Sequence, residues 1–466
     1  MESIALHNLG CKVNGYEMDV MQQILQEKGY KIVPFDEKAD IYIINTCTVT
    51  NIADQKSRQM LHRAKKKNPS AVVVAAGCYV QTGEEKIVQD ASVDLIIGNN
   101  RKKDIAEILE EYLAARKQGM LPGKDKTLQN RTVIDINHTK EYEEMKLHGT
   151  GGHTRAYVKI QDGCNQFCSY CIIPYARGRV RSRREEDILK ETAGLVESGY
   201  QEIVLTGIHI SSYGIDRGSA ELISLLEKLH EIKGLKRIRL GSLEPGIITE
   251  EFAGRLSGLG RVCPHFHLSL QSGCDETLRR MNRRYTTGEY LKKVEILRKY
   301  FDRPAITTDV IVGFPGETEE EFALTESFLE RVHFFEMHIF KYSRRQGTRA
   351  AAMEDQVPDQ IRNERSSRLM QLERRMSEEF RRDFVGERAE ILYEEAKTLH
   401  GEVYQIGHTK RYIRVGKRVR EDLKNRILEE TLTEEFLDDM ILVKDQAAAG
   451  CPDMGIKMSG NSLRIH

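Results

Sequence analysis

Three cysteines lie close together in the segment DGCNQFCSYC, at Cys164, Cys168 and Cys171. Three thiolates on one short loop can bind three irons of a cubic four-iron cluster, which leaves the fourth iron open to a small chelating molecule. The alternatives are a zinc site and three buried structural cysteines. Zinc takes four ligands, and no further cysteine or histidine stands at the usual spacing. The spacing therefore favours an iron–sulfur cluster with one open iron.

Three more cysteines are far apart in the chain, but each follows an apolar run. Cys11, Cys47 and Cys78 end the segments IALHNLGC, IYIINTC and AVVVAAGC. If these runs are strands of one open parallel sheet, their carboxyl ends meet at one edge, where ligand sites gather. The alternative is three ordinary core cysteines. We expect structural roles for the remaining cysteines, which share neither pattern: Cys263, Cys274 and Cys451.

The elements that must position the scattered cysteines alternate between strand and helix. Short β-branched runs and helical patterns predict strands at Ile4–His7, Ile41–Asn45, Ala71–Ala76 and Val93–Ile97, and helices at Glu17–Lys28 and Asp54–Lys66. Alternating β and α units imply an open parallel sheet covered by helices. The polar, glycine-containing stretch Lys117–His153 then predicts a linker with one short strand at Val133–Ile136.

A second series of βα units starts at Arg155 and carries the clustered cysteines. Predicted strands are Arg155–Ile160, Glu202–Ile210, Arg237–Leu243, His265–Leu270, Ile306–Val312 and Phe335–Phe340. Helical patterns follow most of them: Glu185–Glu197, Ala220–Ile232, Glu250–Leu256, Thr287–Tyr300 and Glu319–Arg331. Six such units predict a partial (β/α)6 barrel rather than the eight-fold one. The helix Ile361–Phe384 has one apolar face, which we expect to pack on the barrel.

Short strands with intervening turns follow from Gly386 and predict a small antiparallel β-barrel. Their predicted ranges are Glu390–Tyr393, Gly401–Ile406, Arg411–Val415 and Arg426–Leu432. The fold class is therefore α/β in its first two domains, followed by a β-barrel. The expected limits are 1–117 for the α/β domain, 118–150 for the linker, 151–384 for the partial barrel, 385–446 for the β-barrel and 447–466 for a tail.

The composition is that of an ordinary globular protein, with 40% hydrophobic and 30% charged residues. The apolar runs are far shorter than the roughly 18–20 residues of a membrane span, so we expect no membrane partner. The segment MESIALHNLG has no basic stretch followed by an apolar core, and we expect no signal peptide. We therefore expect a cytoplasmic protein, in whose reducing surroundings cysteines serve as metal ligands more readily than as disulfides.

Acidic and basic side chains balance at 71 each, so a nucleic-acid surface has to be local. Between Lys410 and Arg426, eight basic residues outnumber two acidic ones, with Tyr404 and Tyr412 within or beside the strip. Such a strip suits phosphate contact and base stacking. A second strip, Arg177–Arg184, holds five arginines, which bind phosphate well. The alternative in both places is an ordinary solvated or ion-paired surface.

The C-x3-C-x2-C loop after the first strand of a βα barrel resembles the radical S-adenosylmethionine enzymes. Further segments resemble the methylthiotransferases of that superfamily, over nearly the whole chain: NLGCKVNGYE, INTCTVT, AAGCYVQ, CIIPYARGRVRSR, HLSLQSGC, TTDVIVGFPGETEEEF and HIFKYSRRQGT. The resemblance implies two 4Fe–4S clusters and S-adenosylmethionine as cofactors. One cluster, held by Cys164, Cys168 and Cys171, would bind S-adenosylmethionine and generate a radical from it. The other, auxiliary cluster would be held by Cys11, Cys47 and Cys78.

The superfamily resemblance also indicates residues that contact S-adenosylmethionine. Tyr170 would lie near the adenine, and Gly207 in VLTGIH stands where many members have a glycine-rich strand end, although this chain lacks their fuller GGE pattern. Glu244 and Gln271 follow the third and fourth barrel strands, whose ends line the site of such barrels. For these two residues the alternative is structural hydrogen bonding. The sequence indicates no catalytic side chain.

The motif LGCKVN resembles the branch of the family that modifies N6-threonylcarbamoyladenosine at position 37 of tRNA, near the anticodon. The branches for N6-isopentenyladenosine in tRNA and for an aspartate of a ribosomal protein are alternatives, and their motifs tend to read GCQMN and LGCPKN. A non-catalytic iron–sulfur RNA-binding regulator is a further alternative. The C-terminal barrel resembles the RNA-binding TRAM domain. The implied partners are tRNA and an electron donor and a sulfur donor whose identity the sequence does not give.

Overall fold

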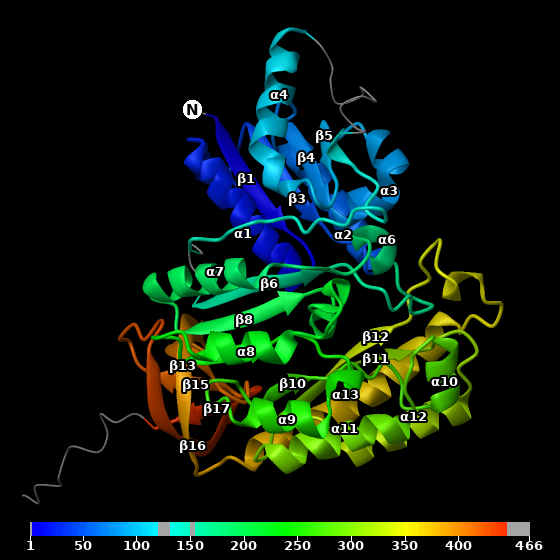
Figure 1. Cartoon of the computed structure of the whole chain (residues 1–466), viewed down its shortest axis with the longest axis vertical. Coiled ribbons are helices and arrows are strands. Elements are labelled where there is room, and N and C mark those ends of the chain that lie inside the picture. Colours follow the sequence, from blue (N-terminus) through cyan, green and yellow to red (C-terminus); the bar gives the residue numbers. More distant parts are fainter. Residues whose placement is uncertain (1, 120–130, 150–153, 445–466) are drawn as a thin grey trace, which may run out of the picture. The chain divides into compact units, whose positions relative to one another are not determined.

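The structure is a computed structural model that describes residues 2–119, 131–149 and 154–444. The chain divides into two compact units, with the boundary between Phe380 and Arg381. The first unit contains two α/β parts and the second a small β-barrel (Figure 1). The predicted tail 447–466, Cys451 and residues 120–130 and 150 of the predicted linker lie outside the described residues. None of the described helices is both long and apolar enough to cross a membrane.

The N-terminal part is a five-stranded parallel sheet in the order β2-β1-β3-β4-β5. Its strands are β1 (Ser3–Asn8), β2 (Lys31–Val33), β3 (Ile41–Thr46), β4 (Val72–Gly77) and β5 (Leu95–Ile97). Its helices are α1 (Lys12–Glu27), α2 (Asn51–Lys67), α3 (Cys78–Val88) and α4 (Ile105–Lys117). Alternate residues of β3 enter two cores, one shared with α1 and α4 and the other with α2 and α3. Helices on both faces explain why every residue of β3 and β4 is buried.

The second part holds six parallel strands in two sheets among the described residues. These are β6 (Arg155–Asp162), β8 (Glu202–Gly207) and β9 (Arg237–Leu240), then β10 (His265–His267), β11 (Ala305–Val312) and β12 (Glu336–Lys341). A parallel bridge between Leu243 and Leu268 joins the two sheets just beyond β9 and β10. The six βα units confirm the predicted partial barrel. A short strand, β7 (Arg181–Ser182), pairs antiparallel with β6 and was not predicted.

Helices cover one face of these strands and form a single core with them. They are α7 (Glu185–Glu197), α8 (Leu222–His230), α9 (Glu250–Ser257), α11 (Thr287–Tyr300), α12 (Glu319–Val332) and α13 (Asp359–Arg382). Ala156, Val158 and Ile160 of β6 enter this core, so the intervening residues face the other side of the sheet. Leu369, Leu372 and Met376 of α13 belong to the same core, which confirms that this helix packs on the barrel.

The short strand predicted at Val133–Ile136 is wrong, because residues 133–136 form no ladder. Their backbone groups have other partners. Gly98 donates its N–H to the carbonyl of Thr132 at 2.8 Å, and the amide of Gln81 donates to the carbonyl of Ile134 at 2.9 Å. Val133 is buried in the core beside α2 and α3. The apolar pattern of this segment therefore reflects burial and not strand pairing.

The second unit is a closed five-stranded barrel in the order β13-β14-β15-β17-β16. Its strands are β13 (Arg388–Leu399), β14 (Glu402–Thr409), β15 (Arg414–Arg418), β16 (Ile427–Leu437) and β17 (Met440–Val443). Four of the five pairings are antiparallel, as predicted, and β15 pairs with β17 in parallel. The unpredicted β17 closes the barrel, and its Ile441 is fully buried.

Candidate metal centres

The scattered cysteines meet at the carboxyl edge of the N-terminal sheet. Cys11 caps the start of α1, Cys47 follows β3 directly, and Cys78 begins α3 directly after β4. The loops touch: a Cβ on Gly10, which has φ +107°, would lie 3.0 Å from the sulfur of Cys47. Burial raises the pKa of the Cys47 thiol to about 11, and the neighbouring thiols Cys78 and Cys11 add to the shift. The structure thus brings three thiols from three loops to one place.

The clustered cysteines occupy the loop between β6 and α6 (Ile173–Arg177). Burial raises the pKa of Cys164 to about 11 and of Cys171 to about 12, and Cys168 contributes to both shifts as a neighbouring charge. Gly163 precedes the loop with φ +73°, and a Cβ there would lie 1.8 Å from the carbonyl oxygen of Arg179. A glycine is therefore required at the start of this loop.

The donor chemistry of both groups fits iron–sulfur clusters. All six cysteines are free thiols, and soft thiolates in threes match a cluster with one open iron. Within the described ranges, one set of three ligating side chains has all its ligand atoms within 4.8 Å of one another, namely His267, Asp309 and His338. The sulfur atoms of neither cysteine group lie this close to one another, although the ligands of a single zinc ion would have to.

One buried arginine donates a hydrogen bond to a thiol in each group. Arg177 Nε lies 3.2 Å from Cys78 Sγ, and Arg283 Nη1 lies 3.2 Å from Cys168 Sγ. Carboxylates hold both guanidinium groups, Glu17 for Arg177 and Glu244 for Arg283. Hydrogen bonds to ligating sulfurs shift the reduction potential of an iron–sulfur cluster. The sequence analysis missed both contacts, because a run of basic residues does not reveal which way a side chain points.

The strip Arg177–Arg184, predicted to contact phosphate, is mostly interior. Arg177, Arg181 and Arg183 are at most 1% exposed. Arg183 pairs with Glu144 at 2.7 Å and with Glu191. The prediction of an RNA-facing strip is therefore wrong for these three residues. Carboxylates pair with them in the interior, so the alternative of an ordinary ion-paired surface does not describe these three residues either.

Two of the four residues predicted to contact S-adenosylmethionine line one cavity. Tyr170 and Gln271 line a hollow of about 230 Å³ together with Asp309, and with Val49 and Thr50 from the loop after Cys47. Gln271 adopts φ +73°, a strained conformation for a residue other than glycine. Its backbone N–H and carbonyl bond to Asp309 and Ile311 of β11 at 2.9 Å each.

The other two predicted contacts have structural partners. Both carboxylate oxygens of Glu244 accept hydrogen bonds from Arg283, at 3.0 and 2.9 Å. Burial would raise the pKa of Glu244, but His209 and Arg283 hold it below its usual value. Gly207 ends β8, and a Cβ there would lie 3.0 Å from the carbonyl oxygen of Gln161. Glu244 thus reaches the clustered cysteines through Arg283 and not directly.

A polar group of the barrel strands, which the sequence analysis did not single out, adjoins the cavity. His267, Asp309 and His338 come from the adjacent strands β10, β11 and β12. His267 Nε2 lies 3.3 Å from Asp309 Oδ2, and the two imidazole rings stack with centroids 5.7 Å apart. Partial desolvation lowers the pKa of His338, the carboxylate of Asp309 raises it, and His267 and Lys12 lower it further. The signal in the sequence was the alternation of polar residues in HFH and TTD at strand positions.

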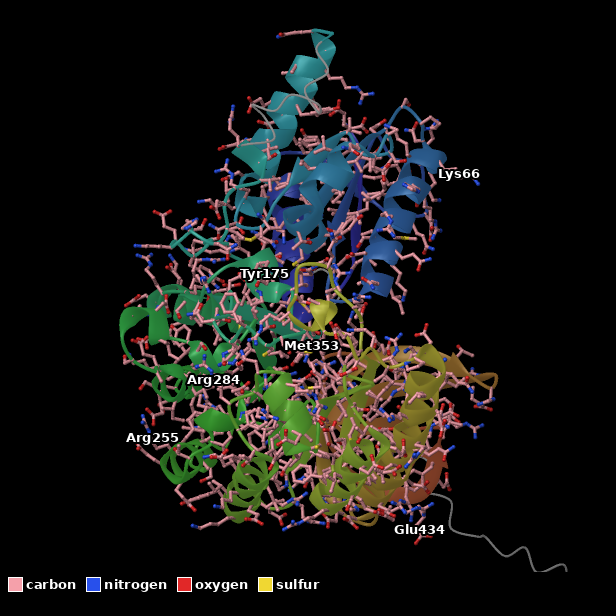
Figure 2. All side chains as sticks on the ribbon, turned by 90° about the vertical axis from the view of Figure 1, so that its right-hand side faces the viewer. Lys66, Tyr175, Arg255, Arg284, Met353 and Glu434 are labelled. Carbon is pink, nitrogen blue, oxygen red and sulfur yellow. The ribbon has the colours of Figure 1, made fainter. Side chains whose placement is uncertain are left out.

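A larger hollow of about 530 Å³ is lined by sequence neighbours of both cysteine groups. Tyr79, the residue after Cys78, and Ile172, the residue after Cys171, both line it. Arg345 lines it as well, and this guanidinium bonds to Thr48, the residue after Cys47, at 2.7 Å. The side chains around these loops are drawn in Figure 2, where Tyr175 and Met353 mark the nearby segments.

The strip Lys410–Arg426 of the second unit is less cationic than its composition suggests. Five of its eight basic side chains pair with carboxylates: Lys410 with Glu390, Arg414 with Asp439, Lys417 with Glu430, Arg418 with Glu402 and Arg426 with Glu421. Tyr404 and Arg418 both line a groove of about 1260 Å³. Tyr412 instead stacks on His408 with ring centroids 4.5 Å apart. An aromatic ring beside an exposed guanidinium suits base stacking and phosphate contact.

The sequence matches two family models and many known proteins. Residues 158–329 match the model of the radical SAM superfamily, and residues 3–98 match the uncharacterized protein family UPF0004. The chain is 41% identical over 430 residues to the threonylcarbamoyladenosine tRNA methylthiotransferase MtaB of Bacillus subtilis (strain 168), covering 92% of this chain and 93% of the relative. The MtaB of Aquifex aeolicus (strain VF5) is 38% identical, with 90% and 99% covered.

A relative with a different substrate in its name is also similar. The tRNA-2-methylthio-N(6)-dimethylallyladenosine synthase of Moorella thermoacetica is 38% identical over 83% of this chain and 85% of the relative. Among solved structures, the radical S-adenosylmethionine methyltransferase TsrM of Kitasatospora setae is similar with a TM-score of 0.54. It is 16% identical, and the match covers 75% of this chain and 74% of that one, so it supports the fold alone.

Proposed function

We propose a substrate and a site for this chain on the premise that it belongs to the tRNA methylthiotransferases of the radical S-adenosylmethionine superfamily. The proposed reaction converts N6-threonylcarbamoyladenosine at position 37 of tRNA into its 2-methylthio derivative. The observation that carries this choice is the 41% identity to the Bacillus subtilis MtaB over nearly the full length of both chains. The second candidate, the dimethylallyladenosine (isopentenyladenosine) activity, rests on relatives of lower identity.

The six cysteines divide into two proposed cluster sites. Cys164, Cys168 and Cys171 hold the cluster that binds S-adenosylmethionine, and Cys11, Cys47 and Cys78 hold the auxiliary one. The convergence of each trio and its sulfur-only donor set support this assignment. When bound, these groups supply one-electron chemistry strong enough for an aromatic C–H bond, which acid–base side chains cannot activate.

The protein's own contribution is to bind and orient S-adenosylmethionine and the target base and to shield them from solvent. Tyr170 and Gln271 are proposed contacts of S-adenosylmethionine, supported by the cavity that they share. We place Gly207 and Glu244 at the edge of the proposed S-adenosylmethionine site, because the carboxylate of Glu244 already accepts hydrogen bonds from Arg283. The base would enter beside Asp309, where His267 and His338 offer donors for the carboxylate and hydroxyl of a threonylcarbamoyl group.

The proposed partner is the anticodon loop of tRNA, where an unstacked base is within reach of a buried site. The TRAM-like β-barrel, whose groove is lined by Tyr404 and Arg418, is the proposed RNA-binding domain. The reaction also requires an electron donor and a source of sulfur, whose identities stay open. A reducing compartment such as the cytoplasm is the proposed location, because six free thiols reserved for iron would otherwise oxidise.

Mass spectrometry of nucleosides tests the proposal directly. Transfer RNA from cells that lack the gene should contain threonylcarbamoyladenosine without its methylthio group, and the wild-type gene should restore it. A complementing copy with Cys168→Ala should not. Loss of the methylthio group from dimethylallyladenosine instead would favour the second candidate, and an unchanged set of tRNA nucleosides would contradict both.

A further inference from the structure

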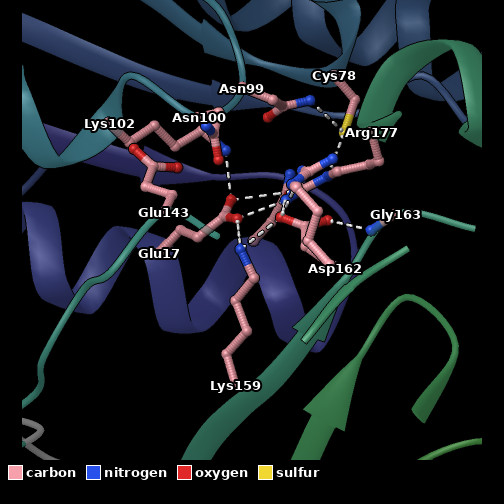
Figure 3. A network of polar contacts seen from close by, with 12 residues as sticks. Glu17, Cys78, Asn99, Asn100, Lys102, Glu143, Lys159, Asp162, Gly163 and Arg177 are labelled. Atoms are coloured by element: carbon pink, nitrogen blue, oxygen red, sulfur yellow. Dashed lines mark hydrogen bonds and ion pairs between the residues drawn. The ribbon is translucent and has the colours of Figure 1, made fainter. Parts of the chain in front are cut away.

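Arg177 lies between the two cysteine groups and contacts both of their surroundings. Its side chain is fully buried, and its Nε donates to Cys78 Sγ at 3.2 Å. Its Nη2 donates to Asn14 Oδ1 at 2.6 Å and to Glu17 Oε2 at 3.0 Å, both on α1. Its Nη1 lies 3.2 Å from Asp162 Oδ2, at the end of β6 (Figure 3). One guanidinium therefore joins a cysteine of the sheet domain to the strand that leads into the clustered cysteines.

The backbone of the next residue completes the connection. The carbonyl of Gly178 accepts the N–H of Cys164 at 3.0 Å. Gly178 has φ +70°, and a Cβ there would lie 2.2 Å from the carbonyl oxygen of Ile136, so no larger residue fits. Two consecutive residues thus each hold one cysteine of a different group, which fixes the spacing of the two proposed cluster sites.

The charges around Arg177 are buried, and three cations share two carboxylates. Glu17 pairs with Arg177, with Lys102 and, at 2.7 Å, with Lys159, while Lys159 reaches Asp162 at 2.6 Å (Figure 3). Burial would raise the pKa of Glu17, but these cations hold it well below its usual range. An arginine does not lose its proton in a protein, so its positive charge beside Cys78 is permanent.

A fixed positive charge and an N–H···S bond act on a cluster in a known direction. Reduction adds an electron, so a nearby cation and a donor to sulfur stabilise the reduced state and raise the reduction potential. A nearby carboxylate acts in the opposite sense. Glu17 is therefore the counter-charge that limits the effect of Arg177 on the cysteines of the N-terminal sheet.

We propose that Arg177 is a positioning residue that fixes the distance between the two cluster sites, and that the pair Arg177–Glu17 sets the reduction potential of the cluster held by Cys11, Cys47 and Cys78. This inference rests on the proposed function, since it requires a cluster at those cysteines. It assigns a task to an arginine whose sequence context had suggested contact with RNA.

The test uses the full chain, reconstituted with iron and sulfide without oxygen, in a parent variant with Cys164, Cys168 and Cys171 changed to alanine. That parent contains one proposed cluster, whose potential can be measured by a redox titration followed by electron paramagnetic resonance. Four further changes are introduced singly: Arg177→Gln, Arg177→Lys, Glu17→Gln and Arg183→Gln. Arg183 is the matched control, because it is equally buried and paired with Glu144 and Glu191.

Arg177→Gln should lower the potential and Glu17→Gln should raise it, whereas Arg177→Lys should restore most of the wild-type value and Arg183→Gln should leave it unchanged. A merely structural role would not give shifts of opposite sign. Equal potentials in all variants, or shifts of the same sign for Arg177→Gln and Glu17→Gln, would overturn the inference. If Arg177→Gln does not fold, the rise in Glu17→Gln decides alone. A parent that binds no iron would instead refute the proposed auxiliary cluster site.

Discussion

At the scale of single residues, each cysteine group is accompanied by one buried arginine with a carboxylate behind it. Arg177 and Arg283 make the same contact, an N–H donated to sulfur at 3.2 Å. The pairing explains why these two arginines are not available to RNA. It also makes each arginine costly to remove, because the carboxylate behind it would lose one of its cations. Glu17 would keep Lys102 and Lys159, and Glu244 would keep His209 at 3.6 Å.

Arg283→Gln should therefore destabilise the chain, but by less than the roughly 3–5 kcal/mol lost when a fully buried pair is broken, because His209 still lies 3.6 Å from Glu244. The carboxylate of Glu244 loses the cation that helps to hold its pKa low. The double variant Arg283→Gln, Glu244→Gln should recover part of the loss, because no unpaired charge remains. Thermal unfolding of both variants gives the comparison, with the exposed neighbour Arg284→Gln as a control of little effect. A double variant that is no more stable than Arg283→Gln would contradict this account of the pair.

Gly163→Ala should impair the loop of the clustered cysteines. The residue has φ +73°, and the added methyl group would lie 1.8 Å from the carbonyl oxygen of Arg179. We expect iron bound by the full chain to fall from about eight to about four atoms per chain, since one of two four-iron clusters is lost. Gly194→Ala within α7 is the matched control: it meets no atom within 4 Å and should gain roughly 1 kcal/mol of helix stability. Full iron content in Gly163→Ala would show that the loop tolerates the change.

At the scale of elements, the sequence predicted the positions of strands better than the contacts between them. The cysteines at strand ends could be placed at one edge because parallel strands share their direction. The six βα units were visible as well, since helical patterns follow most of the strand-like segments. The short strands β2, β7 and β17 were missed, because two to four residues give no periodic pattern. The direction of Arg177 and the grouping of His267 with His338 depend on register, which one sequence does not specify.

A buried ion pair between neighbouring barrel strands gives a prediction for pH. Arg239 Nε on β9 lies 2.8 Å from Glu202 Oε1 on β8, and both side chains are at most 2% exposed. Burial alone would raise the pKa of Glu202, but Arg239 holds it below its usual value. A depressed folded-state pKa stabilises the fold above the unfolded value of about 4.3, and this contribution is lost as the pH falls towards the folded value.

The stability advantage of the wild type over Glu202→Gln should therefore be large at neutral pH and shrink below about pH 4.3. Thermal unfolding of the metal-free chains across this range measures it without interference from iron release. The exposed pair of Glu227 with Arg255 serves as the control, and Glu227→Gln should change stability by less than about 1 kcal/mol at every pH. An advantage that persists undiminished in acid would contradict the assigned role of Glu202.

At the scale of the whole molecule, the 71 acidic and 71 basic residues give no net charge, and in both basic strips many of the basic side chains pair with carboxylates. The strip Arg177–Arg184 is mostly buried against carboxylates, and the strip of the second unit is largely ion-paired at the surface. The surface proposed for tRNA is consequently smaller than either strip suggests. Its exposed basic residues include Arg420 and Lys424.

Changing Arg420 and Lys424 together to glutamine should weaken tRNA binding for all sequences alike. Each lost phosphate contact should reduce the slope of log affinity against log salt by about 1. Binding titrations of the full chain at several salt concentrations measure the slope. Arg388→Gln is the control, because this exposed arginine of the same barrel is paired with Glu429 at 2.8 Å. An unchanged slope would show that the proposed strip does not contact the RNA backbone.

The central claim is that two cysteine groups hold two clusters that act in one reaction. Counting iron and sulfide per chain, together with methylthiolation of tRNA, tests it most directly. We predict about eight irons for the wild type and about four for each variant in which one trio is changed to alanine, and both variants should fail to methylthiolate tRNA. A fully active chain that holds only about four irons would contradict the account.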